Sequence, residues 1–426
     1  MPNCQRSSVE TDPRRTCVRS VRSAAGRPKI SISPTTGFAL IRASRHENPA
    51  MCSRGTESVT VCTRCIMDTT DPDISFDAAG VCNHCHRYEE VARQRIIPPA
   101  QRQERLAQLV AEVKRAGEGK RYDCVIGVSG GVDSTYVAWV VKNLGLRPLA
   151  VHLDNGWNSE LAVANIEKTL NKLGIDLYTH VIDWEEFQNL QISFLKASTP
   201  DGEVPTDHAI FALLYRIAAK HGLRHIITGT NVISEAILPE KWGYGYFDWS
   251  YVKDVHRRFG SARLSTYPHF SLLDLFYYVF LRRIRMVSVL NFIDYNKNQA
   301  MNILQNELGW VYYGGKHYES IYTRFYQAYL LPRKFDIDKR KAHYSNLVLS
   351  GQMTRPDAVE AMKAPVYPAD LLEEDRQYVI KKLNLDAQQF EAIMALPRKT
   401  FLDYKNNRDV FAFAKRLVNS SRRLIG

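Results

Sequence analysis

The segment Ser129-Gly-Gly-Val-Asp-Ser134 restricts the fold of this chain more than any other. It follows an apolar run, 122–128, that predicts a short strand, and it precedes a run, 135–141, with helical spacing. A glycine turn between a strand and a helix forms an anion site, because backbone N–H groups approach phosphate oxygens and the helix dipole attracts negative charge. The segment therefore predicts a phosphate-binding loop in an α/β fold.

Each residue of this turn has an expected role. Gly130 and Gly131 admit phosphate close to the backbone, the hydroxyls of Ser129 and Ser134 add donors, and Asp133 is placed to hold magnesium. The turn is not a Walker loop, because the G-K-[ST] ending is absent. It is not a dinucleotide fingerprint either, because G-x-G-x-x-G is absent.

Four predicted strands are separated by helical patterns, which indicates parallel βαβ units and a doubly wound parallel sheet. The strands are 122–128, 148–153, 177–182 and 225–229, and residues 160–173 look helical. Ligands of such sheets bind at the carboxyl ends of the strands. The candidates there are Asp154, Asn155 and Trp157 after the second strand and Gly229 and Asn231 after the fourth. Each of these residues is expected either to contact a nucleotide or to cap its own loop. For Trp157, a place in the core is a further alternative.

Eight cysteines precede residue 125 and none follows, which favours a reducing compartment, the cytoplasm, over a secreted disulfide protein. Two CxxC pairs, Cys62 with Cys65 and Cys82 with Cys85, are separated by 16 residues. Two such knuckles complete a closed tetrahedral zinc site, which stabilises a module and carries no chemistry. We expect a zinc ribbon over 59–95, with two short strands joined by a turn at 77–80. His84 and His86 are expected on the knuckle surface or, alternatively, as substitute ligands.

The positive charge of the chain is concentrated at its N-terminus. Fifty-seven basic and 45 acidic residues give +12, and residues 1–50 contribute +6 with nine Lys/Arg and three Asp/Glu. The remainder is only mildly basic, so we expect no nucleic-acid partner. Residues 1–58 are expected to be a basic, disordered leader or a wrongly assigned start, with a transit peptide as an alternative. No apolar run is long enough to span a membrane.

The C-terminal half combines polar, basic and aromatic residues in patterns that suit an anionic sugar–nucleotide site. With S-G-G-V-D-S, the chain resembles the PP-loop ATP pyrophosphatase superfamily. More specifically, it resembles the N-acetyl sugar amidotransferase family of surface-polysaccharide biosynthesis. The matching segments are C-T-R-C-I-M-D-T-T at 62–70, D-N-G-W at 154–157, G-T-N at 229–231, Y-G-G-K-H-Y-E-S at 313–320 and D-K-R-K-A-H at 338–343. Some members carry a second thiol pair where this chain has Val204-Pro-Thr-Asp-His-Ala209.

The resemblance implies a PP-loop ATP-binding domain over 96–260 and a mostly helical substrate or partner region over 261–426. It implies that ATP, with magnesium on Asp133 and Glu235, adenylylates an acetamido group on a nucleotide-linked sugar, and that ammonia then gives an acetamidino group. Substrate binding or transition-state stabilisation is expected from Lys316, His317, Glu319 and Arg324, with Lys339, Arg340 and Lys341 behind them. Those last three are alternatively an exposed charge run.

Ammonia needs a source, and no glutaminase nucleophile is present, because Cys124 lies in a predicted buried strand. The resemblance implies a separate glutaminase pair similar to imidazole-glycerol-phosphate synthase subunits. The aromatic stretch 272–281 is a docking surface for it or, as we expect, part of the core. Two other functions stay open: a tRNA-thiolating PP-loop enzyme, and a zinc-ribbon adaptor that senses nucleotides without turnover.

Overall fold

The computed structural model describes residues 59–315 and 318–414. The chain divides into two compact units, and the first of them, residues 1–57, lies outside the described residues. The predicted leader therefore lies outside them as well. Every element described below belongs to the second unit, which contains the cysteine module, the phosphate loop and the C-terminal helices.

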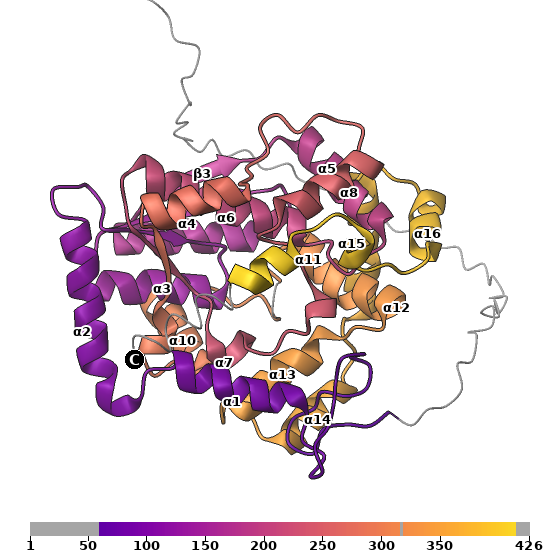
Figure 1. Ribbon diagram of the computed structural model, residues 1–426, viewed down its shortest axis with the longest axis horizontal. Coiled ribbons are helices and arrows are strands. Elements are labelled where there is room, and N and C mark those ends of the chain that lie inside the picture. Colours follow the sequence, from indigo (N-terminus) through magenta and orange to yellow (C-terminus); the bar gives the residue numbers. More distant parts are fainter. Residues whose placement is uncertain (1–58, 316–317, 415–426) are drawn as a thin grey trace, which may run out of the picture. The chain divides into compact units, whose positions relative to one another are not determined.

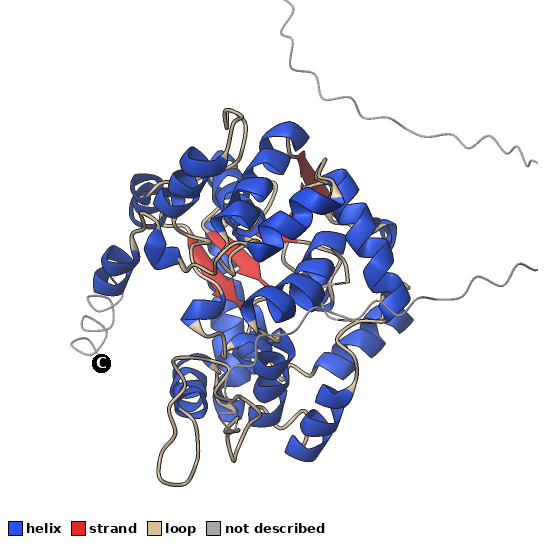
Figure 2. Cartoon of the chain, turned by 90° about the vertical axis from the view of Figure 1, so that its right-hand side faces the viewer, coloured by secondary structure: helices blue, strands red, loops and turns tan. Residues whose placement is uncertain are grey.

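A five-stranded parallel sheet forms the centre of this unit, surrounded by helices (Figure 2). Its strands are β1 (Cys124–Gly127), β2 (Pro148–Asp154), β3 (Asp176–Val181), β4 (His225–Thr228) and β5 (Arg285–Ser288), in the order β3-β2-β1-β4-β5. The predicted doubly wound sheet and its first four strands are confirmed. The fifth strand was not predicted, and it extends the sheet beyond residue 260, where the sequence places the end of the ATP-binding domain.

The two faces of the sheet bury separate cores, because successive side chains of a strand point in opposite directions. Val125 and Leu149 pack on the face covered by α5 (Trp184–Ala197) and α6 (Val204–Lys220). Their neighbours Cys124, Ile126 and Ala150 pack with α3 (Val132–Asn143) and α4 (Glu160–Leu173). Both faces are apolar, as expected for a parallel sheet between two layers of helices. Cys124 is fully buried in β1, which confirms its predicted place in a buried strand, and burial raises the pKa of its thiol.

The remaining helices extend these two layers. Around the sheet lie α2 (Pro99–Ala116), α7 (Val232–Glu235), α8 (Trp249–Phe259) and α10 (Lys297–Ile303). The C-terminal region contributes α11 (Ile321–Phe325), α12 (Leu331–Phe335), α13 (Lys339–Leu349), α14 (Arg355–Lys363), α15 (Ala369–Lys382) and α16 (Ala387–Ala395). Short 3-10 or π turns are η1 (Glu240–Trp242), η3 (Val289–Phe292), η4 (Leu304–Leu308), η5 (Tyr326–Leu330) and η6 (Phe401–Asp403). This C-terminal part is helical, as predicted.

The cysteine module differs from the expected ribbon. Its only antiparallel pairings in the described chain are two isolated bridges, Val61 with Asp68 and Phe76 with Cys82. The segments that carry the knuckles turn too soon for a ladder to form, so the predicted pair of strands is wrong. Helix α1 (Asn83–Arg95) begins directly after Cys82 and lies beside α13 (Figure 1).

The stretch 272–281 is helical but is not buried in the core. It forms α9 (Leu272–Phe276), which continues into the π-helical η2 (Tyr277–Leu281). The inward side chain of Tyr278 stacks on Tyr215 of α6, whereas Leu273 and Phe280 are 81% and 62% exposed. Both faces of this helix are apolar, so the composition alone could not show which one faces outward. The prediction of core burial is wrong.

None of the helices in the described part of the chain is long and apolar enough to cross a membrane.

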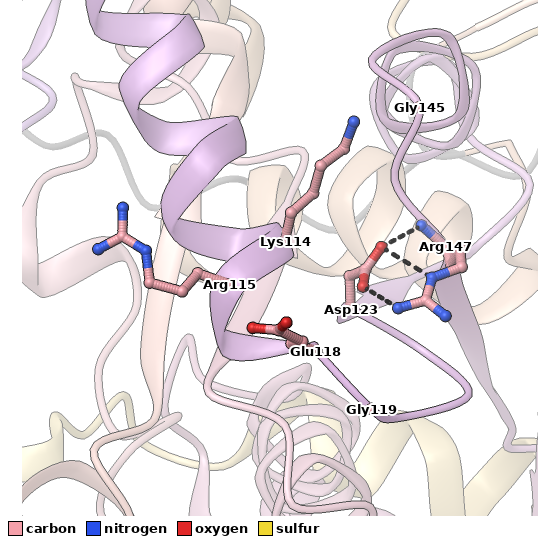
Figure 3. A pocket seen from close by; sticks show the side chains of 7 residues that line it. All are labelled: Lys114, Arg115, Glu118, Gly119, Asp123, Gly145 and Arg147. Atoms are coloured by element: carbon pink, nitrogen blue, oxygen red, sulfur yellow. Dashed lines mark hydrogen bonds and ion pairs between the residues drawn. The ribbon is translucent and has the colours of Figure 1, made fainter.

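An open recess of about 450 Å³ lies at the amino ends of β1 and β2, beside the C-terminal end of α2 (Figure 3). Its buried carboxylate, Asp123, accepts hydrogen bonds from Arg147 N at 2.9 Å and Arg147 Nη2 at 2.6 Å. These bonds connect the start of β1 to the start of β2. The phosphate loop follows the carboxyl end of β1, so this recess is a feature of the fold's opposite edge.

We predict that Asp123→Ala lowers the free energy of unfolding by about 1–3 kcal/mol, because it leaves Arg147 N–H donors without their acceptor. Glu118→Ala, at an exposed position of the same recess, is the control and is expected to change stability by less than about 0.5 kcal/mol. Urea denaturation measures both. Equal stability of the two variants would contradict the role given to Asp123.

Candidate nucleotide and metal sites

The predicted phosphate loop joins β1 to α3. Ser134 Oγ lies 3.1 Å from Ser129 Oγ and accepts a hydrogen bond from Ser129 N at 3.2 Å. Gly131 N donates to Ser129 Oγ at 3.3 Å, and α3 begins at the next residue. Two hydroxyls and several amides thus converge at a helix N-terminus, which is the arrangement that binds phosphate oxygens.

Gly130 gives the loop its shape. Its φ is +80°, in the left-handed region, and an added side-chain carbon would lie 2.7 Å from the carbonyl oxygen of Ala162 in α4. A side chain is therefore excluded both by the backbone conformation and by the neighbouring helix. Trp310 Nε1 donates to the carbonyl of Gly130 at 2.9 Å, which holds the turn from the C-terminal side.

Two described residues of the predicted substrate segment, Tyr313 and Glu319, lie against this loop. An added side-chain carbon at Gly131 would be 3.1 Å from Glu319 Oε1 and 3.4 Å from the hydroxyl of Tyr313. The backbone of the segment is fastened to the end of β2, because Ser159 N donates to Glu319 O at 2.9 Å and Ile321 N donates to Trp157 O at 2.9 Å. The fold thus brings Glu319 to the phosphate loop across almost 190 residues of sequence. Lys316 and His317 lie outside the described residues.

The two predicted magnesium ligands share one neighbourhood. The hydroxyl of buried Tyr295 donates to Asp133 Oδ1. The pKa of Tyr295 is raised first by burial, then by the charge and hydrogen bond of Asp133, and also by the negative charge of Glu235. The end of β4 at Gly229 packs against Asp133 and leads into α7, which ends at Glu235. Two carboxylates beside a phosphate loop are the oxygen donors that a hard divalent cation requires, and the site fits magnesium.

The residues after β4 have structural roles in close packing and in helix capping. An added side-chain carbon at Gly229 would lie 3.0 Å from the carbonyl carbon of Asp133, so glycine lets β4 end against the start of α3. Asn231 is the N-cap of α7, and its Oδ1 accepts from Ser234 N at 2.8 Å. These contacts fix the start of α7, the short helix that ends at Glu235. Direct contact of Gly229 and Asn231 with a nucleotide stays a prediction.

The residues after β2 form a capped turn. Asp154 Oδ1 accepts from Gly156 N at 2.9 Å, and Asn155 Oδ1 accepts from Trp157 N at 3.1 Å. Asn155 Nδ2 also donates to Thr206 in α6 at 3.1 Å. Trp157 is fully buried and donates to Gln191, which confirms the alternative that it is a core residue. Contact of Asp154 and Asn155 with a nucleotide stays a prediction.

Those predicted basic residues of the C-terminal half that the structure describes are paired with acids. Arg324 forms a two-bond ion pair with buried Asp375, 2.7 Å for each bond, and its guanidinium lies over the rings of Tyr318 and Tyr367. This pairing neutralises its charge, so Arg324 holds α11 to α15. Its predicted contact with substrate stays a prediction.

The run 339–341 is also not an exposed charge run, because all three side chains are partly buried and paired. Lys339 Nζ binds Glu203 Oε2 at 2.7 Å, Arg340 binds Asp338, and Lys341 binds Asp68. The three cations point to different elements, so they do not form one patch.

Sequence reasoning missed an acidic pair at the start of α6. Glu203 accepts hydrogen bonds from Lys339 and from Gln327 Nε2, the latter at 2.9 Å. Asp207, one turn later, is exposed to solvent. The sequence did contain a signal, because Glu203 and Asp207 are four residues apart and this spacing places both acids on one face of a helix.

The four knuckle cysteines form one buried cluster, with all sulfur atoms within 4.8 Å of one another. Sγ–Sγ distances are 3.7 Å for Cys62 and Cys85, 3.6 Å for Cys65 and Cys82 and 3.7 Å for Cys82 and Cys85. A tetrahedron of sulfurs at Zn–S distances of about 2.3 Å has edges of about 3.8 Å, so the cluster fits zinc.

Neither histidine of the knuckle belongs to this cluster. His84 is buried and bonded to Asp71 at 2.6 Å, so its predicted surface position is wrong. The buried carboxylate beside it holds the ring inside the module. His86 is exposed, as expected, and its Nε2 lies 2.9 Å from Asp77 Oδ2. The metal site therefore has four thiolates and no open position for a substrate.

Two protein families match this chain. Residues 319–418 match the family described as LPS biosynthesis protein WbpG-like, C-terminal domain, and residues 103–262 match the family described as NAD synthase. The first match covers the segment that begins at Glu319, and the second covers the phosphate loop, strands β1 to β4 and helices α3 to α8.

Individual relatives are more distant. The tRNA-specific 2-thiouridylase MnmA 2 of Fusobacterium nucleatum is 29% identical over 112 residues, 25% of this chain and 32% of the relative, so the chain spans about a third of that protein. Among solved structures, NMN synthetase from Francisella tularensis is 14% identical, with a TM-score of 0.29, over 68% of this chain and 98% of its own. NH3-dependent NAD synthetase from Campylobacter jejuni is 18% identical, with a TM-score of 0.27, over 49% of this chain and 85% of its own.

The parallel sheet, the S-G-G-V-D-S loop and the NAD-synthase match define the class: this is a PP-loop protein. Such proteins use ATP, usually with magnesium. Together with the WbpG-like C-terminal match, these findings support an amidotransferase-type PP-loop protein of lipopolysaccharide biosynthesis, which is the family that the sequence motifs indicated.

We predict that Gly130→Ala abolishes nucleotide binding and destabilises the protein, because the new side chain meets the carbonyl of Ala162. Gly119→Ala is the matched control. Gly119 also has a positive φ, +72°, but no atom lies within 4 Å of an added side-chain carbon. The control should therefore show only the left-handed backbone cost, about 1–2 kcal/mol. Titration calorimetry with ATP and urea denaturation measure both effects; equal ATP affinity of the two variants would contradict the assignment of the loop.

Proposed function

We propose that this protein is an ATP-dependent amidotransferase that converts the N-acetyl group of a nucleotide-linked sugar into an acetamidino group. The observation that carries the proposal is the position of Glu319 and Tyr313 beside Gly131. It places the start of the WbpG-like region against the loop expected to bind the phosphates of ATP. A carbonyl substrate held by the C-terminal region would then face the nucleotide directly.

The proposed reaction has two steps. The acetamide oxygen attacks the α-phosphorus of ATP, which forms an O-adenylyl imidate and releases pyrophosphate. Ammonia then adds to the imidate carbon, and AMP leaves with the former acetamide oxygen. Because the oxygen departs on AMP, the two steps account for the replacement of oxygen by nitrogen.

The residues of the loop have distinct parts in the first step. The amides of Gly130 and Gly131 and the hydroxyls of Ser129 and Ser134 would bind the departing pyrophosphate at the start of α3. Asp133 and Glu235 would hold magnesium, which neutralises charge on the phosphates when it is bound. Glu319 would accept a hydrogen bond from the N–H of the acetamide. This bond would make the acetamide oxygen a better nucleophile.

The ammonia is proposed to come from a separate glutaminase subunit. Four of the five described cysteines belong to the zinc-type cluster, and the fifth, Cys124, is buried and has a raised thiol pKa. None of them suits a glutaminase nucleophile, which must be an accessible thiolate. The exposed apolar stripe of α9 and η2, which contains Leu273, Phe276, Tyr277, Phe280 and Leu281, supports this helix as the docking surface. Reduced thiols and the use of ATP suit the cytoplasm.

The similarity to a tRNA 2-thiouridylase keeps thiolation as the second candidate. Among the described residues, Cys124 is the only thiol outside the zinc-type cluster, and burial makes it a poor sulfur carrier. A nucleotide-sensing adaptor is the third candidate, and it would leave ATP intact.

We predict that the protein releases pyrophosphate from ATP only when an N-acetylated nucleotide sugar is present, and that release of AMP and repeated turnover also require ammonium. The product should be lighter than the substrate by the difference between an oxygen atom and an NH group. Mass spectrometry and a pyrophosphate assay measure these outcomes. Asp133→Asn should slow the reaction at least about 100-fold, because the charge of the departing pyrophosphate is no longer balanced.

The other candidates give different results in the same assay. Salt-sensitive binding of tRNA, together with ATP cleavage that depends on tRNA, would identify a thiolase. The absence of any pyrophosphate release with a panel of acetamido sugars would leave the nucleotide-sensing function.

We predict that Leu273→Ser combined with Phe280→Ser weakens binding of the glutaminase subunit about tenfold or more, because buried apolar anchors carry most of the energy of an interface. Glutamine-driven turnover should fall, whereas turnover with ammonium salts should stay unchanged. Leu402→Ser, at another position that is 60% exposed, is the control. Equal loss of ammonium-driven turnover, or unchanged binding, would contradict the docking surface.

A further inference from the structure

The zinc-type module is bound to the C-terminal helices through its knuckle. Arg355 of α14 donates to the carbonyl of Cys65 from Nε at 3.0 Å and to that of Cys62 from Nη2 at 2.8 Å. Ile66 N, inside the same knuckle, donates to Ser345 Oγ of α13 at 3.2 Å. The backbone of the metal ligands themselves is therefore fastened to α13 and α14.

A buried ion pair completes this attachment. Asp68, two residues after the knuckle isoleucine, binds Lys341 of α13, and Lys341 Nζ also donates to Thr70 Oγ1 at 3.1 Å. Asp68 and Ser345 are buried, and the side chain of Lys341 is 18% exposed. Buried, charge-assisted bonds of this kind are short and directional, so they define the position of a helix.

Two further contacts of α13 reach toward the proposed active site. Ile237 N donates to Asn346 Oδ1 at 2.9 Å, and Asn346, which is almost fully buried, also donates to the carbonyl of Ala342 in its own helix. Ile237 follows Glu235 by two residues, so this bond holds the end of α7. At the start of α13, Lys339 binds Glu203 beside Asp207.

The module also contacts the chain beyond α7 directly. Asp73 binds Lys241 at 2.6 Å, and α1 packs against α7 and α13 (Figure 1). The segment 232–242 is therefore held from two sides, by α13 and by the cysteine module. The distance along α13 from Lys341 to Asn346 is about 7.5 Å, at about 1.5 Å per residue, so one rigid helix makes both contacts.

We propose that the metal-bound knuckle is a positioning device for the magnesium site. By holding α13, it sets the place of α7 and hence of Glu235 opposite Asp133, and it sets Lys339 beside Glu203. Lys341 and Asn346 are positioning residues in this scheme, because they act through α7 and touch no substrate. The inference rests on the proposed function only where it names Glu235 as a magnesium ligand.

Lys341→Met tests the scheme, with Lys363→Met as the matched control in the exposed ion pair with Glu360 on α14. The first readout is amide hydrogen exchange of the full-length protein. The zinc content of each variant is measured alongside it. We expect faster exchange of the amides of α7 in Lys341→Met, with unchanged exchange in α3 and unchanged zinc content. Identical exchange of α7 in the two variants would overturn the proposal.

The second readout is pyrophosphate release as a function of magnesium concentration. Lys341→Met should raise the magnesium concentration for half-maximal rate about tenfold, as expected when support of a metal ligand is lost, and should retain most of the rate at saturation. Lys341→Arg should restore most of the affinity, which a general loss of stability would not explain. A lower saturating rate with unchanged magnesium dependence would contradict the positioning role.

A third variant and zinc removal cover the case in which Lys341→Met does not fold. Asn346→Ala breaks the α13–α7 contact without touching the knuckle, and a chelator removes the metal from the wild-type protein. Both should loosen α7, and unchanged exchange in both would overturn the proposal. If α7 loosens as expected but the wild-type protein releases no pyrophosphate with any acetamido sugar, the proposed function fails and the positioning role stands.

Discussion

The left-handed turn at Gly130 is the constraint on which the rest of the site depends. Its backbone lies so close to the carbonyl of Ala162 that only glycine fits, and this closeness turns the amides of the loop toward the start of α3. Trp310 then binds the carbonyl of Gly130, and Glu319 and Tyr313 approach Gly131. The C-terminal region is thus assembled on the loop, so a change in the turn would displace both halves of the site.

Charge balance explains much of the remaining architecture. Asp133 accepts a hydrogen bond from the buried hydroxyl of Tyr295, and burial, Asp133 and Glu235 together raise the pKa of this tyrosine, an arrangement that a divalent cation would stabilise. Among the described basic side chains, Arg324 and Lys341 do not supply that positive charge, because they are paired with Asp375 and Asp68. These ion pairs hold helices together instead. The cysteine module belongs to the same framework, since its knuckle binds α13 and α14.

Sequence patterns predicted the elements that depend on local chemistry. The apolar runs gave four of the five strands, α4 was predicted at its observed bounds, and the CxxC pairs gave the four-sulfur cluster. They failed where a pattern suited two environments. The stretch 272–281 is apolar on both faces, so its exposure depends on α6 occupying one of them. The short run at 285–288 carried too weak a strand signal, and His84 carried no sign of its buried partner Asp71.

The sequence by itself determined the phosphate loop, the parallel α/β sheet and the cysteine cluster, because each needs residues that are close together in the chain or repeat with a fixed period. Only the tertiary structure decided which distant residues join them. It brought Glu319 to Gly131, Glu235 toward Asp133, and Glu203 to Lys339. Such contacts depend on the packing of α6, α7 and α13 around the carboxyl edge of the sheet, and no local pattern encodes that packing.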